Sequence, residues 1–416
     1  MIDKKLLFIL IPSFLIKIIF LFFFHEATLG NEWRVLFNNF DKFKIFSYYN
    51  LQGENLPSSY MPPLYLIFLF INKLLSFDLF NFIFMVYFSQ VCLSTISVIL
   101  FYKLCQNFFD RRISLIGSLF FAFIPLLIFS NALISSASLQ IFLYLLFLNF
   151  CIKFLEDSSK VNTFTFAVIC ALCLLLRGEF LVIFVLTIIF FFLSRNKKIT
   201  KLISLIIITL LLISPYLIRN YINTSKIHIV NVTGYALWKG NNHLSKVEGY
   251  HIPLSPKIER RINWPDVPEF KMLYEKLDNL KINRNYEIER DKIFLDEAKK
   301  NILSDKKKYF HLYFKKVLSY YFIDIDSSIE NYYSPFHIYP LIMLSILSLI
   351  GIIICFTKKN SEKILFVFVT MICLIFLISL FYILPRYKIS IIIFQTLFSL
   401  YAIEHIVEKF KNKYNK

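Results

Sequence analysis

The chain has 416 residues, of which 57% are hydrophobic and 18% aromatic, and its mean hydropathy is +0.61. Soluble domains are about 45–50% apolar, so this composition indicates a membrane protein and excludes disordered, coiled-coil and disulfide-scaffold proteins. The 46 basic and 28 acidic residues give a net charge of +18, but many short loops share the surplus. A nucleic-acid-binding protein would concentrate it on one face.

Apolar segments predict ten membrane-spanning helices, since about 20 apolar residues cross a bilayer. Eight segments are uninterrupted: 5–24, 80–103, 113–130, 138–155, 199–218, 336–356, 363–383 and 387–405. The run 164–193 contains Arg177-Gly178-Glu179, and a single helix there would place two charges near the bilayer centre. We therefore predict a hairpin of two shorter helices, 164–176 and 180–193, with the charges at its tip.

The segment 61–76 is short, opens with Pro62-Pro63, and is predicted to lie in the outer membrane interface without crossing. If Lys4 and Lys5 are cytoplasmic, the basic loops between the spans then face the cytoplasm as well, as the positive-inside rule requires. If 61–76 crossed, the next three basic loops would face outward. The sequence thus predicts a multi-pass protein of a bacterial cytoplasmic membrane with both termini inside.

These spans divide the chain into three regions. Residues 1–218 are predicted to form an N-terminal membrane module with an outer loop at 25–60. Residues 219–335 are predicted to form a small, mainly helical extracytoplasmic domain, and 336–416 the C-terminal membrane helices and cytoplasmic tail. Apolar residues recur with helical spacing between 285 and 318, which predicts one or two amphipathic helices there.

The sequence has no nucleotide-binding glycine motif, nucleophile elbow or zinc-binding spacing, and its seven histidines are scattered. It therefore predicts neither a metal nor a cofactor. The seven cysteines lie in or beside apolar runs. Cys170 and Cys173 form a C-x-x-C pair inside an apolar helix, where they are interpreted as small core residues.

Polar residues concentrate instead on the predicted outer side of the membrane, and such a convergence is a candidate functional site. Carboxylates take protons from acceptor groups, and arginines hold phosphate. The alternative for each residue is a solvated charge, or one that reaches the interface from a helix end. The residues are Glu26, Glu32, Arg34, Asp41, Asn131, Arg177, Glu179, Arg219, Asn220, Arg386, Tyr387 and Lys388.

Five short motifs occur in order along the chain: PSSYMPPLYL at 57–66, FDRRISLIGSLFFAFIP at 109–125, LLLRGEF at 174–180, PYLIRNY through LWKGNN at 215–242, and PRYKI at 385–389. Together they resemble motifs of the GT-C superfamily of polytopic glycosyltransferases. The resemblance is to the glycosyltransferase family 39 group, which includes protein O-mannosyltransferases and lipid A aminoarabinose transferases.

The resemblance implies an all-helical GT-C fold and transfer of a sugar from a polyprenyl-phosphate carrier to a glycan, lipid or protein acceptor at the outer face. It implies a catalytic acid in the first outer loop. Glu32 matches best, and Asp41 is the second candidate. The motif positions add candidate substrate-binding residues: Tyr60, Pro63, Tyr65, Arg177, Glu179, Arg219, Asn220, Arg386, Tyr387 and Lys388.

The chain departs from the family pattern at two places. The second outer loop, 131–138, has no acid, and Met61 stands where some members have a phosphate-contacting lysine. Either one carboxylate suffices, or Asp41 or Glu179 substitutes, or the protein is inactive. Two alternative functions remain open: a surface-polysaccharide polymerase or ligase, and a transporter or lipid flippase. A transporter would be expected to show related halves and polar residues at the bilayer midplane.

Overall fold

The structure is a computed structural model of the whole chain. It describes residues 3–25, 29, 31–51, 54–77, 81–194, 199–250, 268–327, 334–357 and 361–414. Within these ranges, the side chains of residues 31–32, 49–51, 54–55 and 412–414 are not described.

Seven helices of the described residues are long and apolar enough to cross a membrane. They are α1 (Lys4–Phe24), α4 (Phe82–Cys105), α7 (Ala137–Glu156), α10 (Ile199–Thr224), α15 (Pro335–Thr357), α16 (Glu362–Ser379) and α17 (Ile389–Tyr414), which follows the short helix η2 (Pro385–Lys388). Each coincides with a predicted span. The predicted hairpin is present as α8 (Lys160–Leu176) and α9 (Phe180–Leu193), so the all-helical membrane fold is confirmed.

The predicted span 113–130 differs from the structure because it is divided into two helices. α5 (Arg111–Ala122) ends, and α6 (Pro125–Ser130) begins at a proline. Proline forces the preceding residue out of the helical conformation, and Ile124 has an extended backbone with φ −61° and ψ 119°. Neither piece is long enough to be a candidate span by itself.

The first predicted outer loop folds into α2 (Asn31–Phe43) and a hairpin of the short antiparallel strands β1 (Tyr49–Leu51) and β2 (Glu54–Leu56). The next helix, α3 (Leu64–Leu75), has 12 residues, too few to cross a bilayer. In α2, Trp33, Leu36 and Phe37 are buried with helical spacing, and α2 packs on α3. The Trp33 and Tyr65 rings meet edge to face, with centroids 4.6 Å apart.

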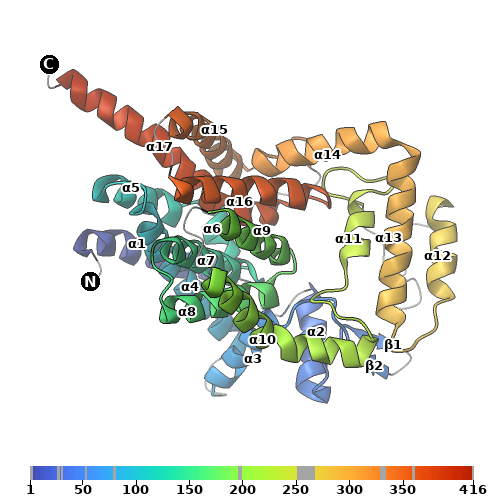
Figure 1. Cartoon of the computed structure of the whole chain (residues 1–416). Coiled ribbons are helices and arrows are strands. Elements are labelled where there is room, and N and C mark those ends of the chain that lie inside the picture. Colours follow the sequence, from blue (N-terminus) through green and yellow to red (C-terminus); the bar gives the residue numbers. More distant parts are fainter. Residues whose placement is uncertain are drawn as a thin grey trace.

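Between α10 and α15 the chain forms a group of helices that we call the insert. It comprises α11 (Thr233–Gly240), η1 (Pro268–Phe270), α12 (Lys271–Asp278), α13 (Tyr286–Ser304) and α14 (Lys306–Tyr321). The last two are the predicted amphipathic helices. Figure 1 shows the insert beside the helical bundle, with α11 lying against α13. A small core of its own, which includes Trp238 and Phe294, holds α11, α12 and α13 together.

Candidate functional site

The tip of the α8–α9 hairpin presents an ion pair. Arg177 ends α8 in extended conformation, and Glu179 precedes the first residue of α9. Arg177 Nε lies 2.7 Å from Glu179 Oε1, and the two side chains are 30% and 21% exposed. Tyr387, which lies 210 positions later in the sequence, is close enough to interact electrostatically with Arg177. The structure therefore brings the LLLRGEF and PRYKI motifs together.

A cluster of cations and aromatic rings surrounds η2. The Arg386 guanidinium lies 5.8 Å from the Tyr387 ring centroid, and the Tyr382 and Tyr387 rings are 5.7 Å apart. From α11, Lys239 Nζ lies 4.2 Å from the Tyr382 ring centroid. Lys239 belongs to the LWKGNN motif, so a third motif reaches the same place. We call these residues and the hairpin tip the outer site, after the side of the membrane that the sequence predicts for them.

The LWKGNN segment is fixed tightly against the chain that leads to η2. A Cβ on Gly240 would lie 2.1 Å from Phe381 O, so no larger residue fits without displacement of backbone. Asn241 Nδ2 donates to Leu380 O at 2.8 Å. On the other side, Lys316 Nζ of α14 donates to Gly240 O at 2.7 Å. The glycine allows the close backbone approach that places Lys239 beside Tyr382.

A second polar cluster joins the PSSYMPPLYL motif to the insert. The buried Glu287 carboxylate of α13 accepts hydrogen bonds from Ser58 Oγ and Ser59 N, both at 2.8 Å, and from Ser59 Oγ at 2.9 Å. Burial raises the pKa of Glu287, although Arg290 and these hydrogen bonds oppose the shift. Because Ser59 Oγ gives its single proton to Glu287, His228 Nε2–H donates to Ser59 Oγ at 2.6 Å. We call this cluster the serine clamp.

Arg219 and Asn220 of α10, which belong to the PYLIRNY motif, hold the backbone around the serine clamp in place. Arg219 donates to Ser58 O at 2.7 Å, Phe46 O at 2.8 Å and Asn220 Oδ1 at 2.8 Å. Asn220 Nδ2 donates to His228 O at 2.8 Å. Three of the five guanidinium donor directions are thus directed at protein oxygens, which assigns Arg219 a positioning role.

The serine clamp and the hairpin tip are neighbours. A Cβ on Gly178 would lie 2.5 Å from Val230 Cγ1, so the segment that carries His228 touches the tip. Asn231 N donates to Ser59 O at 3.0 Å in the same segment. Four of the five motifs therefore meet at one end of the bundle. The fifth lies elsewhere: Arg111 of α5 pairs with Asp3, just before α1.

Two predicted residues of the PSSYMPPLYL motif support the surrounding chain. Tyr65 is buried, and its OH donates to Gln90 Oε1 at 2.9 Å. Gln90 Nε2 donates to Asn131 O and Leu133 O, which fixes the predicted second outer loop. Pro63 immediately precedes α3, where its fixed φ suits a helix start.

Tyr60 stacks on Tyr48 with ring centroids 4.7 Å apart. The Arg290 guanidinium lies 5.9 Å from the Tyr60 ring centroid, so Tyr60 also contacts the insert.

The candidate acids lie on α2. Asp41 Oδ1 accepts from Lys73 Nζ of α3 at 2.7 Å, an ion pair that is about one-third exposed. Glu32 is in the first turn of α2, but its side chain lies outside the described residues, as does Glu26. Lys388 is buried, and its Nζ donates to Tyr321 O at 3.2 Å, so it holds α14 in place within the protein.

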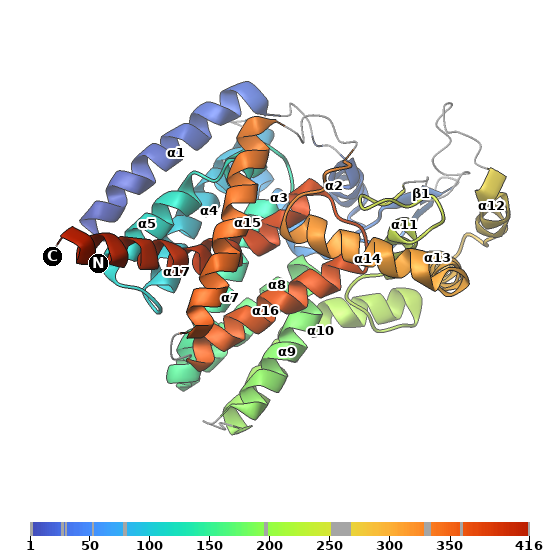
Figure 2. The ribbon, with the colours of Figure 1, turned by 90° about the horizontal axis from the view of Figure 1, so that it is seen from above.

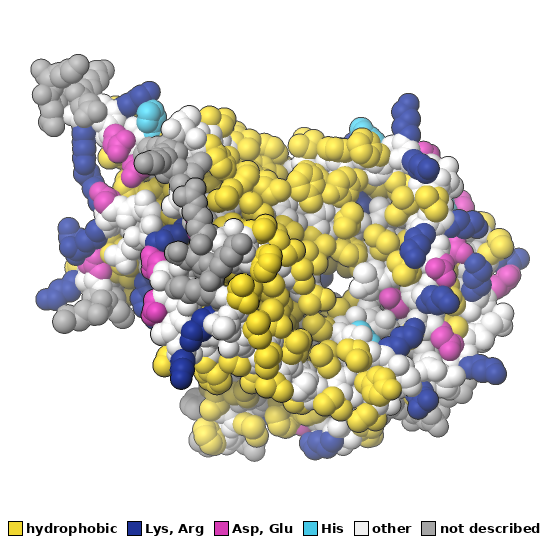
Figure 3. All heavy atoms as spheres, in the orientation of Figure 1, with side chains coloured by type: hydrophobic (Ala, Val, Ile, Leu, Met, Phe, Trp, Pro, Cys, Tyr) yellow, Lys and Arg dark blue, Asp and Glu magenta, His cyan; other side chains and the backbone are white. Residues whose placement is uncertain are grey.

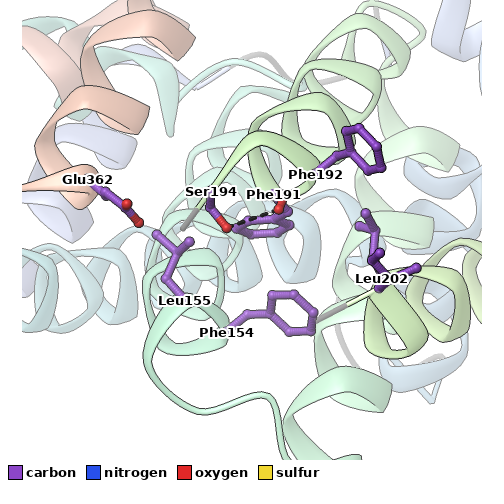
Figure 4. A pocket seen from close by; sticks show the side chains of 8 residues that line it. Phe154, Leu155, Phe191, Phe192, Ser194, Leu202 and Glu362 are labelled. Atoms are coloured by element: carbon purple, nitrogen blue, oxygen red, sulfur yellow. Dashed lines mark hydrogen bonds between the residues drawn. The ribbon is translucent and has the colours of Figure 1, made fainter. Parts of the chain in front are cut away.

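The candidate residues do not line the pocket at the opposite end of the bundle (Figure 4). A small cavity of about 20 Å³ lies there among the ends of α7, α9, α10 and α16. The pocket walls are largely apolar: Phe154, Leu155, Phe191, Phe192, Ile199 and Leu202, with Ser194 and Glu362. Among the described residues, no group of three His, Cys, Asp or Glu side chains is arranged to hold a metal ion.

Sequence reasoning missed Glu287, His228 and Lys239 as residues of this region. One signal was present: Glu287, Arg290 and Asp291 recur with the same spacing as the buried Phe294 and so share the packed face of α13. Charged residues on the packed face of an amphipathic helix require partners, because an unpaired buried charge is costly.

The fold is similar to that of solved membrane enzymes, although no family model and no curated protein matches the sequence. The archaeal oligosaccharyltransferase AglB from Archaeoglobus fulgidus, in complex with an inhibitory peptide and a dolichol-phosphate, superposes with a TM-score of 0.54 at 14% identity. The alignment covers 97% of this chain and 50% of that one. The same enzyme in complex with Zn and sulfate gives a TM-score of 0.55 at 13% identity, over 97% and 49%.

ArnT from Cupriavidus metallidurans, bound to undecaprenyl phosphate, is less similar, with a TM-score of 0.43 at 10% identity over 96% of this chain and 77% of that one. The present chain spans about half the length of the archaeal enzyme. The arrangement of helices that the sequence motifs implied is thereby confirmed: the chain has a GT-C-like membrane fold.

Proposed function

We propose that this protein is a membrane glycosyltransferase that moves a sugar from a polyprenyl-phosphate-linked donor to a glycan, lipid or protein acceptor at the outer face of a bacterial cytoplasmic membrane. The observation that carries the proposal is the meeting of four motifs at one end of the bundle. Arg177, Arg386 and Lys239 supply cations there, and Tyr382 and Tyr387 supply aromatic faces. Such a surface suits a sugar phosphate at the membrane boundary.

In the proposed reaction, an acceptor hydroxyl or amine attacks the anomeric carbon of the lipid-linked sugar. The bond between that carbon and the phosphate oxygen breaks, and the polyprenyl phosphate leaves with the electron pair. Arg177 and Arg386 stabilise the negative charge that develops on the phosphate. We assign the acceptor proton to Glu32, which belongs to the first turn of α2, shortly after the first span.

The similarity to AglB supports the class of substrate. That enzyme's structure is a complex with an inhibitory peptide and a dolichol-phosphate, which is a polyprenyl-type phosphate. The common fold extends over 97% of the present chain. A lipid-phosphate donor also agrees with the position of the outer site next to the ends of apolar helices.

A purified-protein assay tests the proposal. The protein is reconstituted in liposomes with a radiolabelled polyprenyl-phosphate sugar, and release or transfer of the sugar is measured. We expect turnover for the native chain and a strong loss for Arg177→Ala. Arg112→Ala is the matched control, because Arg112 is exposed on α5 beside the Arg111–Asp3 pair, away from the outer site.

Each rival function predicts a different result in this assay. A flippase would move the intact donor across the bilayer without release of sugar, and a polymerase would act on a lipid-linked oligosaccharide instead of a single sugar. Orientation is tested separately by cysteine labelling. Lys281→Cys, exposed on the insert, should react with an impermeant reagent from outside, whereas Lys103→Cys, exposed at the end of α4, should react only after permeabilisation.

A further inference from the structure

Helix α14 carries a stripe of exposed apolar side chains although it is not among the candidate spans. Phe310, Phe314 and Leu318 are 66%, 45% and 58% exposed, and their spacing of four places them on one face. Figure 3 shows this apolar surface over α14 next to the apolar surface of the membrane bundle. Exposing two phenylalanines and a leucine to water on one helix face is unfavourable. The stripe therefore indicates that something apolar covers it.

The opposite face of α14 is buried and makes polar contacts. Lys316 Nζ donates to Gly240 O at 2.7 Å and to Asn241 Oδ1 at 3.1 Å. Tyr320 is fully buried on the same side. The buried face also carries Tyr309, Leu312 and Tyr321, which join the hydrophobic core, so α14 has apolar side chains directed both into the protein and outward. This distribution is typical of helices in contact with lipid.

The end of α14 lies deep along the membrane helices. Ser345 Oγ of α15 and Gln395 Nε2 of α17 both donate to Tyr321 O at 2.8 Å. Ser345 is ten residues from Pro335, the first residue of α15, which is about 15 Å along a helix axis. Half of the hydrocarbon core is also about 15 Å thick. Figure 2 agrees, since α14 meets α15 part-way along its length.

The beginning of α14 lies near the ends of the bundle helices. Tyr313 OH donates to Phe376 O at 3.2 Å, and Phe376 is an exposed residue of the last turn of α16. Lys306, Lys307 and Lys308, which begin α14, are all exposed. The stripe therefore continues the lipid-facing surface of α16, and the lysines stand where anionic headgroups would lie.

We propose that α14 is a re-entrant helix that enters the leaflet on the side of the insert. Lys306, Lys307 and Lys308 lie among the phospholipid headgroups, and the exposed Lys315 extends its long side chain toward them. Phe310, Phe314 and Leu318 contact acyl chains at increasing depth. The occupant of the apolar stripe is phospholipid, because the stripe is continuous with a lipid-facing surface and begins with basic residues. The inference does not depend on the proposed catalytic activity.

Fluorescence quenching by brominated phospholipids tests this placement in the full-length chain reconstituted in liposomes. Single variants place a tryptophan at Phe310, Phe314 or Leu318, and the signal of the unmodified chain is subtracted. Ile346→Trp, exposed on α15, is the lipid-facing reference. Met272→Trp, on α12, is the water-facing control because Met272 is 69% exposed on the far side of the insert. A monodisperse gel-filtration peak verifies the fold of each variant.

We expect the three α14 tryptophans to lose as much fluorescence as the one at Ile346, and the one at Met272 to lose little. Bromines near the headgroup should quench most at Phe310, and bromines near the chain ends should quench most at Leu318. Quenching no stronger than at Met272 would overturn the proposal. So would blue-shifted but unquenched emission, which would mean that protein, such as a second copy, covers the stripe. Equal quenching by headgroup bromines at all three positions would show a helix lying flat on the membrane.

Discussion

Arg177 Nε and Glu179 Oε1 lie 2.7 Å apart at the tip of a hairpin between two apolar helices. The pair places a cation at the membrane boundary while neutralising part of its charge. Arg177 also lies near Tyr387, which places the pair beside the cluster around η2. Two roles therefore compete for Arg177: a phosphate ligand, and a structural partner of Glu179.

Arg177→Ala is expected to weaken donor binding by about tenfold to a hundredfold, the equivalent of losing a charged hydrogen bond worth roughly 1.5–3 kcal/mol. Arg177→Lys should also weaken binding, because a lysine lacks the planar fork that matches phosphate oxygens. The measurement is equilibrium binding of a polyprenyl-phosphate sugar to the purified protein.

The two roles of Arg177 are separated by Glu179→Gln. If Arg177 binds phosphate, loss of the competing carboxylate should leave donor affinity unchanged or increase it. If the pair is only structural, Arg177→Ala and Glu179→Gln should lower the thermal midpoint alike and leave donor affinity unaltered. The second pattern would remove Arg177 from the substrate site.

Most of the fold could be predicted from the sequence because lipid imposes a simple length and polarity rule. The hairpin followed from the cost of burying Arg177 and Glu179, and the amphipathic helices of the insert followed from periodicity. The serine clamp could not be predicted in this way. Ser59 and Glu287 are 228 positions apart, and nothing in their local sequence indicates that they meet.

The division of 113–130 was overlooked for a different reason. Hydropathy measures only average polarity, which Pro125 scarcely changes, whereas the backbone break at Ile124 depends on the proline's steric effect. The same limit applies to the site. The order of the motifs suggested which residues converge, but not that Arg219 and Lys388 would donate hydrogen bonds to backbone carbonyls.

Gly240→Ala is expected to destabilise the protein by about 1–3 kcal/mol or more, as overpacking does. The new Cβ would lie 2.1 Å from Phe381 O, and a backbone atom cannot move aside without shifting the segment that leads to η2. Gly178→Ala is the matched control, since its Cβ would meet the tip of a side chain, Val230 Cγ1, at 2.5 Å. Thermal unfolding followed by fluorescence should show the larger loss for Gly240→Ala. A smaller loss there would contradict the close approach.

His228 is expected to make the folded protein sensitive to mild acid. Burial lowers the pKa of His228 below its ordinary value of 6.5. Between that lowered pKa and 6.5 the unfolded chain binds more protons than the folded chain, so stability falls as the pH decreases through this window. His228→Gln lacks the titrating group. When the pH is lowered from about 7 to about 5, the midpoint temperature of thermal unfolding should therefore fall further for the native chain than for His228→Gln.

Glu287 provides the check on that experiment because it touches the same serine. Burial raises the pKa of Glu287, and a raised carboxyl pKa gives the opposite sign: the folded state binds more protons, so acid favours folding in its window. Removing His228 alone should therefore leave an acid-stabilised protein relative to the native chain. An identical pH profile for the native chain and His228→Gln would show that His228 does not titrate within the serine clamp.

Glu32→Gln and Asp41→Asn distinguish the two candidate catalytic acids on α2. Glu32→Gln keeps the side-chain volume but removes the base, so turnover should fall by about 10²–10⁴-fold with donor binding nearly unchanged. Asp41 is engaged by Lys73 at 2.7 Å in a partly exposed pair, and such pairs are worth about 0–1 kcal/mol. Asp41→Asn should therefore cost little stability and leave turnover close to that of the native chain. Both rates are measured in the liposome assay with the same labelled donor. Normal turnover in Glu32→Gln together with an inactive Asp41→Asn would transfer the role of base to Asp41, with Lys73 positioning its carboxylate.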